Sequence, residues 1–236
     1  MTESFPIYRF LDCHAAEKTL ESGRFRVGLL SKFNDPFEWK LGFTGILTPE
    51  EQSFADKYNS DHLSWIEDWM GVMCFSDTAS DPVHWSIYAE KHRGVAFEVQ
   101  YAWNSKEEHL FKMTYTNERP VLNFSQLRIL RKNCSQAVID AYLKGLVDRL
   151  RHQKSPGFSF EKEYRLSIDL RNKKRCQYKD GNHDWQLPYN SLKRVILGFR
   201  SPIEESKVRR LLDKSGFFET KITRAEMCSE TYSIKY

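Results

Sequence analysis

The sequence predicts an α+β fold with a mixed or mostly antiparallel sheet as its core and helices flanking it. Short apolar runs rich in β-branched and aromatic residues are typical of strands, and segments with helical spacing separate them. The two kinds of segment do not alternate regularly, so a doubly wound parallel sheet is not expected. Aromatic residues make up 14% of the 236 residues, which favours a β-rich core. No linker or repeat interrupts the chain, and we therefore expect a single domain over residues 1–236.

Twelve segments carry these signals. The expected strands are residues 7–10, 25–30, 72–75, 95–99, 111–115, 164–168, 195–197 and 220–223. The expected helices are residues 49–69, 82–92, 134–152 and 203–214. The first of these helices has Thr48 as its N-cap and Pro49 at its first position, which is where proline is best tolerated.

The composition favours a cytoplasmic protein. No apolar run approaches the roughly 20 residues needed to cross a bilayer, and Met1–Pro6 lack the features of a signal peptide. The five cysteines are odd in number and form no C-x-x-C pair, so we expect reduced thiols. They are Cys13, Cys74, Cys134, Cys176 and Cys228. An effector secreted by another route has the same pattern, and that alternative stays open.

Charge is distributed unevenly along the chain. Residues 1–120 hold 12 Lys and Arg against 19 Asp and Glu, whereas residues 121–236 hold 24 against 13. The second half therefore has a balance of +11, which indicates either an anionic partner such as nucleic acid or a well-solvated basic face. The runs 171–175 and 128–132 would supply phosphate contacts in a non-enzymatic nucleic-acid module, although a run such as 171–175 is also typical of a solvated loop.

Three separated segments gather polar and aromatic side chains. In the first, Tyr8 and Arg9 are neighbours on a strand, so one side chain points to the core and the other away. In the second, Ser76 ends a strand, and a stripe at helical spacing follows it. That stripe consists of Trp85, Tyr88, Ala89 and His92. It is typical of a buried helix face, but its aromatic rings could also stack on a base or nicotinamide.

The third segment contains two glutamates. If Glu161 and Glu163 both lie on a strand, they share a face with Cα atoms about 6.6–6.8 Å apart. Like charges at this spacing repel unless each has a partner, and paired carboxylates are suited to glycosidic-bond chemistry. The alternative is a charged solvent face of the strand.

A fourth segment, Phe33–Glu38, contains the turn signal Asn34-Asp35-Pro36. Asp35 or Glu38 could orient a neighbouring arginine. Asp35 with Glu38-Trp39-Lys40 also imitates the Asp…Glu-x-Lys site of a metal-dependent nuclease, although the three-residue separation is short for such a site. The histidines and cysteines have no zinc-ligand spacing, so no metal is expected otherwise.

Together these segments resemble the bacterial family labelled domain of unknown function 2971. The matching residues are Tyr8-Arg9-Phe10, Phe33–Glu38, Cys74-Phe75-Ser76, Trp85–Gly94, Lys154 and Phe160–Arg165. The resemblance covers roughly residues 7–199. It implies a bacterial protein with a role in defence or stress, and the family label supplies no reaction.

The order of an arginine, a serine and a Glu-x-Glu is also similar to ADP-ribosyltransferases of the Arg–Ser–Glu type, which use NAD as substrate. This resemblance implies that Arg9, or Tyr8 beside it, holds NAD and that Ser76 braces the pocket. Glu163 would stabilise the oxocarbenium-like transition state, and Glu161 would activate the acceptor. The loop 155–159 would recognise the target, a protein or a nucleic acid. The sequence departs from the family's pattern in having Cys-Phe-Ser in place of Ser-Thr-Ser.

We therefore expect an ADP-ribosyltransferase-like enzyme or NAD glycohydrolase of the defence or toxin class, with a nucleic-acid-binding module and a nuclease as alternatives. Arg9, Ser76 and Glu163 should line one cleft, with Trp85, Tyr88, His92 and Arg165 beside them. Asn34, Asp35 and Glu38 should complete the site. Lys154 should belong to a basic patch next to it.

Overall fold

The computed structural model describes residues 5–100, 108–188 and 190–236, so most of the N-terminal segment considered for a signal peptide lies outside it. The chain divides into two compact units. The first unit is made of residues 1–28, 71–111 and 160–236, and the second of residues 29–70 and 112–159. The chain passes between them several times, and the single-domain organisation stays a prediction.

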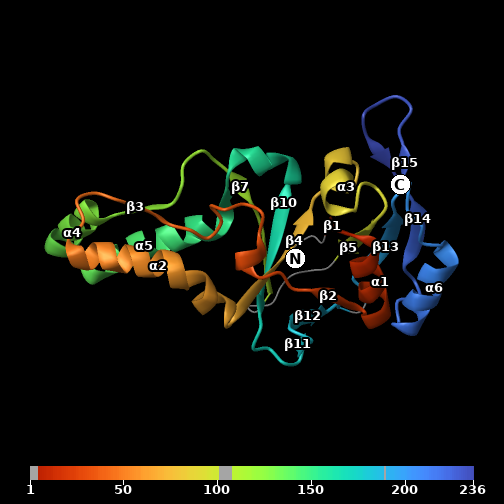
Figure 1. Ribbon diagram of the computed structural model, residues 1–236, viewed down its shortest axis with the longest axis horizontal. Helices are drawn as coiled ribbons and strands as arrows, with labels where there is room; N and C mark the ends of the chain where they lie inside the picture. Colours follow the sequence, from red (N-terminus) through yellow and green to blue (C-terminus); the bar gives the residue numbers. More distant parts are fainter. Residues whose placement is uncertain (1–4, 101–107, 189) are drawn as a thin grey trace. The chain divides into compact units, whose positions relative to one another are not determined.

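The first unit is built on a seven-stranded sheet (Figure 1). Its strand order is β14 (Lys221–Arg224), β13 (Leu192–Leu197), β5 (Val95–Gln100), β1 (Pro6–Leu11), β4 (Met70–Ser76), β10 (Glu163–Asp169) and β6 (Glu108–Lys112). β1 pairs antiparallel with β4 and β5, and β5 with β13, whereas β13 and β14 are parallel. The predicted fold class is therefore confirmed: the protein is α+β, with a mixed and mostly antiparallel sheet.

The two faces of this sheet are covered differently. On one face, α3 (Pro82–Tyr88) packs through Trp85 into a cluster with Tyr8, Ala96 and Ile196. On the other, Phe97 meets Phe25 of β2 (Arg24–Arg26), with ring centroids 5.5 Å apart. β2 joins β12 (Asn182–Gln186) and β11 (Cys176–Lys179) in a three-stranded antiparallel sheet. A residue next to Tyr8 on β1 therefore lies on the other face of the sheet, among different neighbours. This difference decides which side chains of β1 can belong to the candidate site.

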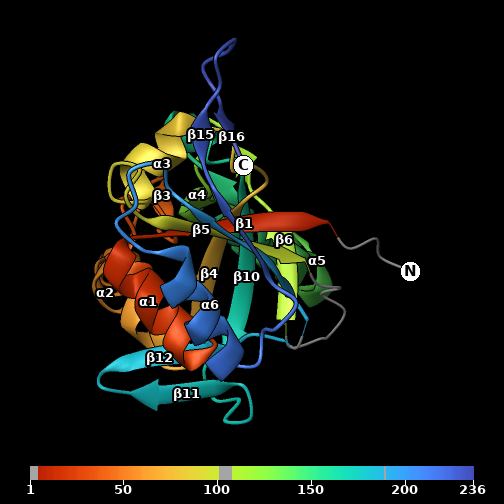
Figure 2. The same ribbon diagram turned by 90° about the vertical axis from the view of Figure 1, so that its right-hand side faces the viewer.

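Two helices of the first unit lie side by side (Figure 2), namely α1 (Cys13–Ser22) and α6 (Glu205–Lys214). α1 was not among the expected helices, yet both of its ends carry sequence signals. Asp12 caps it by accepting from the Ala15 amide at 2.7 Å, and Gly23 ends it at φ 65°, a conformation that favours glycine. The short strands β15 (Glu226–Met227) and β16 (Ile234–Lys235) pair near the C-terminus.

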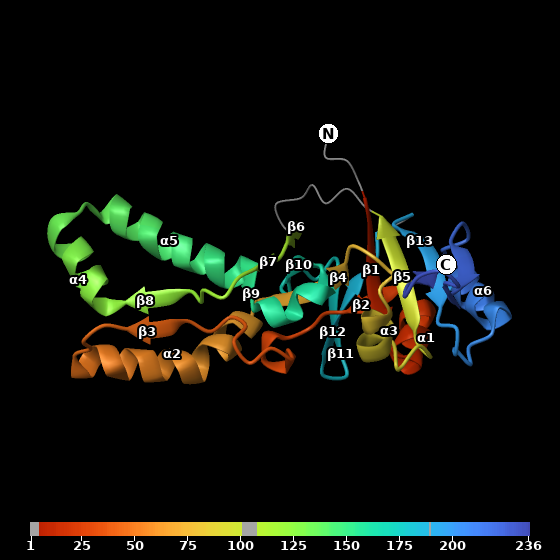
Figure 3. The same cartoon turned by 90° about the horizontal axis from the view of Figure 1, so that it is seen from above.

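The second unit is mainly helical. Its helices are α2 (Pro49–Glu67), α4 (Phe124–Asn133) and α5 (Gln136–His152), with a 3₁₀ turn at Leu30–Lys32. Figure 3 shows β3 (Gly42–Thr44) and β8 (Val121–Asn123), a parallel pair, running between α2 and α5. β7 (Thr114–Tyr115) and β9 (Gln153–Lys154) form a second parallel pair. The predicted start of α2 is confirmed, because Thr48 and Glu51 form a complete capping box and Pro49 is the first residue of the helix.

Three sequence expectations for these elements are wrong. Residues 111–115 do not form one strand, because β6 ends at Lys112 and β7 begins at Thr114 in a different sheet. Residues 25–30 do not form one strand: β2 ends at Arg26, Gly28 makes an isolated bridge to Val72, and Leu30 begins the 3₁₀ turn. The helix expected over 82–92 ends at Tyr88, because Glu90, Lys91 and His92 all have positive φ. None of the described helices is long and apolar enough to span a membrane.

Candidate functional site

The polar end of the α3-covered face is formed by Tyr8 and Ser76. These residues are directly opposite each other in the antiparallel pair of β1 and β4, so their side chains share a face. Both are buried. The Tyr8 hydroxyl accepts a hydrogen bond from the Tyr236 hydroxyl at 3.1 Å, which leaves its own proton for donation. Burial and this bond raise the pKa of Tyr8, so the phenol stays neutral at physiological pH.

Arg9 lies on the opposite face of the sheet from Ser76, and the prediction that both line one cleft is wrong. The reason is the alternation of side chains along β1, which points Arg9 away from Tyr8. Its guanidinium lies 5.0 Å from the ring centroid of Phe25 and 5.9 Å from that of Phe75, and it donates to the Arg26 carbonyl at 2.6 Å. Burial lowers the pKa of Arg9 to about 10, which still leaves it charged at neutral pH.

The aromatic stripe of residues 85–92 is split into a core part and an outer part. Trp85 is fully buried, and its indole nitrogen donates to the Ala79 carbonyl at 2.8 Å, so its ring cannot stack on a ligand as expected. Tyr88 is half-buried at the end of α3. His92 lies beyond the helix, where its Nε2 is 3.0 Å from the Ser86 hydroxyl and its ring packs on Phe199. Of these three rings, that of Tyr88 is the one that lies at the end of α3, neither fully buried nor beyond the helix.

Glu161 is attached to the same face through α3. It ends a 3₁₀ helix (Pro156–Glu161), its side chain is buried, and its Oε1 accepts from the Tyr88 hydroxyl at 2.5 Å. Its backbone carbonyl lies 3.0 Å from Nε2 of His84, whose ring stacks on Phe10, a residue on the Tyr8 side of β1. Glu161 is thus held from two positions of α3, its carboxylate by Tyr88 and its backbone by His84, over the face that carries Tyr8 and Ser76.

Glu163 has a different environment. Lys162 has φ 46°, and the strand begins only at Glu163, so the expectation that both glutamates share a strand face is wrong. The two oxygens of Glu163 accept from Nε and a terminal nitrogen of Arg165 at 2.6 and 3.0 Å. Both side chains are buried, with exposed fractions of 3% and 1%. This bidentate pair is a buried salt bridge rather than a charged solvent face.

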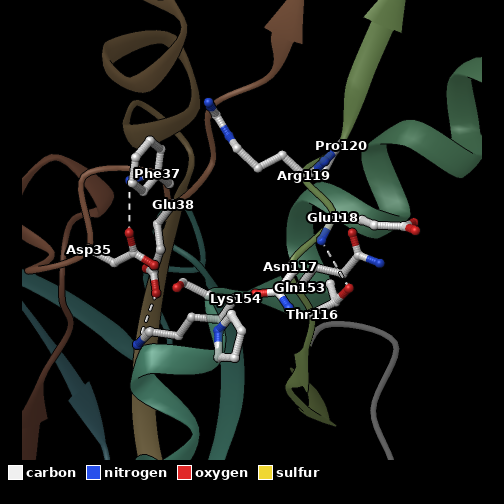
Figure 4. A pocket seen from close by; sticks show the side chains of 12 residues that line it. Asp35, Phe37, Glu38, Thr116, Asn117, Glu118, Arg119, Pro120, Gln153 and Lys154 are labelled. Atoms are coloured by element: carbon white, nitrogen blue, oxygen red, sulfur yellow. Dashed lines mark hydrogen bonds and ion pairs between the residues drawn. The ribbon is translucent and has the colours of Figure 1, made fainter.

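The second unit contains a pocket of about 180 Å³. Figure 4 shows Asp35, Phe37 and Glu38 on one side of it and residues 116–120 across from them. Nζ of Lys154 lies 3.0 Å from Oε1 of Glu38, and both side chains are buried. The prediction of Lys154 in an exposed basic patch is therefore wrong, because this lysine neutralises an internal carboxylate.

Asp35 contributes a buried carboxylate to this pocket. Its Oδ1 accepts from the Phe37 amide at 2.9 Å, which forms the expected turn after the exposed Asn34. Its Oδ2 is buried and has no hydrogen-bond partner within residues 5–100, 108–188 and 190–236. An unsatisfied buried group costs about 1–3 kcal/mol, and more when it is charged, so this oxygen is unusual.

The residues compared with the Asp…Glu-x-Lys site of a metal-dependent nuclease are not arranged as expected. Asp35 and Glu38 do lie together, but the cation beside Glu38 is Lys154 and not Lys40. In the part of the chain that is described, no three His, Cys, Asp or Glu side chains are grouped so as to hold a metal ion.

His84 is a residue of the site that the sequence reasoning missed. It is buried between Phe10 and the Glu161 backbone, and burial lowers its pKa, so it is neutral at physiological pH. The signal available in the sequence was its position one residue before Trp85, in the first turn of a helix with proline at its start.

Cys228 is the thiol for which we expect the highest reactivity. Hydrogen bonds from Thr231 and from backbone amides lower its pKa to about 6, so the thiolate dominates above that pH. Iodoacetamide should therefore alkylate Cys228 at a rate that rises with a midpoint near pH 6. Mass spectrometry of digests at pH 5 to 8 measures this, with the exposed Cys134 as control. Equal rates at the two cysteines at pH 6.5 would contradict the expectation.

Comparisons with family models, with curated protein sequences and with solved structures give no match. The resemblances to the domain of unknown function 2971 family and to ADP-ribosyltransferases stay predictions.

Proposed function

We propose that the protein consumes NAD, as an ADP-ribosyltransferase or an NAD glycohydrolase, and that Glu161 is its central carboxylate. The observation that carries the proposal is that β1, β4 and β10 are neighbours in the sheet. The three segments singled out in the sequence therefore meet, with Tyr8 opposite Ser76 and Glu161 held by α3 over the same face.

The chemistry requires a carboxylate in a protected position. Cleavage of the bond between nicotinamide and ribose develops positive charge on the sugar, and a fixed negative group stabilises that charge as it appears. Glu161 meets this requirement, because it is buried and oriented by the Tyr88 hydroxyl. Burial strengthens its electrostatic effect, since fewer water molecules screen it.

The remaining polar groups of this face are suited to binding the substrate. Tyr8 offers a neutral hydroxyl whose oxygen is already engaged by Tyr236, so its proton can be given to a ribose or phosphate oxygen. Tyr88 offers a half-buried ring beside Glu161. Arg9 has no part in this arrangement, because it lies on the other face of the sheet.

Glu163 is better explained as a structural residue. Arg165 holds both of its oxygens, so a ribose hydroxyl would have to compete with a charged, bidentate donor. We therefore transfer the role of stabilising the oxocarbenium ion from Glu163 to Glu161.

An NAD titration of the wild-type protein tests the proposal. We expect saturable binding by calorimetry and nicotinamide release by chromatography, with cell lysate added as a source of acceptors. If the protein neither binds NAD at millimolar concentration nor releases nicotinamide, the proposed function is wrong. NADH is the matched control, since its reduced ring is a poor leaving group and should not be released.

A further inference from the structure

The pocket of the second unit is assembled from two walls that are far apart in the sequence. One wall is the turn 35–38, and the other is the segment 116–120 with residues 153–156 beside it (Figure 4). Its volume of about 180 Å³ is smaller than the ~300–1,000 Å³ of pockets for drug-sized ligands. It would hold one polar group and a few methylenes.

The backbone behind the carboxylate wall is held firmly. Trp39 has φ 58°, and its side chain is buried. Its carbonyl lies 2.6 Å from Nε2 of His62, which stacks on Tyr58 of the same helix, α2. The turn that carries Asp35 and Glu38 is thus fixed to a long helix, as a preformed binding site requires.

The pocket contains two buried carboxylates. Asp35 and Glu38 are 5% and 6% exposed, and the buried cation among the lining residues, Lys154, is 3.0 Å from Glu38. Oδ2 of Asp35 has no hydrogen-bond partner in the described part of the chain.

The rim of the pocket adds an aromatic surface. Phe37 is exposed, and the Arg119 guanidinium lies 4.7 Å from its ring centroid while also donating to the Lys40 carbonyl. A ring that already attracts one exposed guanidinium can attract a second cation at the pocket mouth.

We infer that this pocket binds a small organic cation with N–H donors, an amine or guanidine, whose charged group reaches Oδ2 of Asp35. Such a group supplies the donor that Oδ2 lacks, and its positive charge strengthens the hydrogen bond to a buried carboxylate. A phosphate or carboxylate ligand is disfavoured, because it would meet two buried carboxylates. The inference does not depend on NAD chemistry, since all residues of the pocket belong to the second unit.

The experiment is a titration with agmatine, which carries a guanidinium and an ammonium group, followed by calorimetry and by amide chemical shifts. Asp35→Asn keeps the size and the acceptor for the Phe37 amide but removes the charge. We expect it to weaken agmatine binding by about tenfold to a hundredfold, the range for a charge-assisted hydrogen bond. Glu118→Gln, at the exposed edge of the same pocket, is the matched control and should change binding less than threefold.

A second variant keeps the test valid if Asp35→Asn fails to fold. Phe37→Leu alters an exposed ring and should weaken agmatine binding about twofold to fivefold. Inorganic phosphate serves as the anionic probe and should not bind. Absence of agmatine binding at millimolar concentration, equal affinity in wild type and folded Asp35→Asn, or tighter binding of phosphate than of agmatine would each overturn the inference.

Discussion

Replacement of Glu161 by glutamine is expected to lower nicotinamide release by about 10²–10³-fold while NAD affinity changes little. This is the scale of loss when one preorganised electrostatic group is removed from a site where charge develops. The substitution keeps the size of the side chain and an oxygen that can accept from Tyr88. It removes the negative charge, and the transition state needs that charge more than the bound substrate does.

The measurement compares single-turnover nicotinamide release from wild type and Glu161→Gln, with NAD affinity determined by calorimetry for both. Glu219→Gln is the control, because Glu219 is an exposed carboxylate of the same unit. Release should be unchanged in the control. If the wild type releases nicotinamide and Glu161→Gln does so at the same rate, another carboxylate carries the chemistry.

Tyr88→Phe separates the position of Glu161 from its charge. The variant loses the hydroxyl that donates to Oε1, so the carboxylate is less well oriented but still charged. We interpret Tyr88 as a positioning residue, and the loss of turnover should therefore be smaller than in Glu161→Gln.

Much of the fold could be predicted because the long elements carry redundant signals. β5 is a short run of apolar residues that is buried except for the half-buried Glu98 and Gln100, and α2 has a proline and a complete capping box at its start. Residues 25–30 show where this reasoning stops. Their composition is that of a strand, but only Arg24–Arg26 find a partner along β12, so tertiary pairing decided the outcome.

The candidate site was harder to predict, because a difference of one residue along a strand changes which side chains face the site. Tyr8 or Arg9 could face the site, and the choice is fixed by the register of β1 against β4, which the sequence does not reveal. The relation of Glu161 to Glu163 depends on the positive φ of Lys162, which breaks the alternation that a strand would have imposed. The pairing of Glu38 with Lys154 joins residues distant in the sequence and had no local signal.

Replacement of Glu163 by glutamine should destabilise the protein rather than affect catalysis selectively. Glu163 and Arg165 are both buried, and two hydrogen bonds of 2.6 and 3.0 Å join them. The variant leaves the arginine buried without the charge of this partner, and the cost of breaking a buried pair in this way is about 3–5 kcal/mol. Whole domains are stable by only about 5–15 kcal/mol, so the urea midpoint should fall substantially.

The same strand provides a matched control for this effect. Asp169 and Arg171, at the other end of β10, are also two residues apart and also form a bidentate pair, at 2.9 and 3.2 Å. Their side chains, however, are 36% and 67% exposed. Water replaces the lost partner at such a site, so Asp169→Asn should cost less than about 1 kcal/mol in urea unfolding. Similar losses for Glu163→Gln and Asp169→Asn would show that burial does not set the strength of the Glu163–Arg165 pair. Full stability of Glu163→Gln together with a loss of nicotinamide release would return the catalytic role to Glu163.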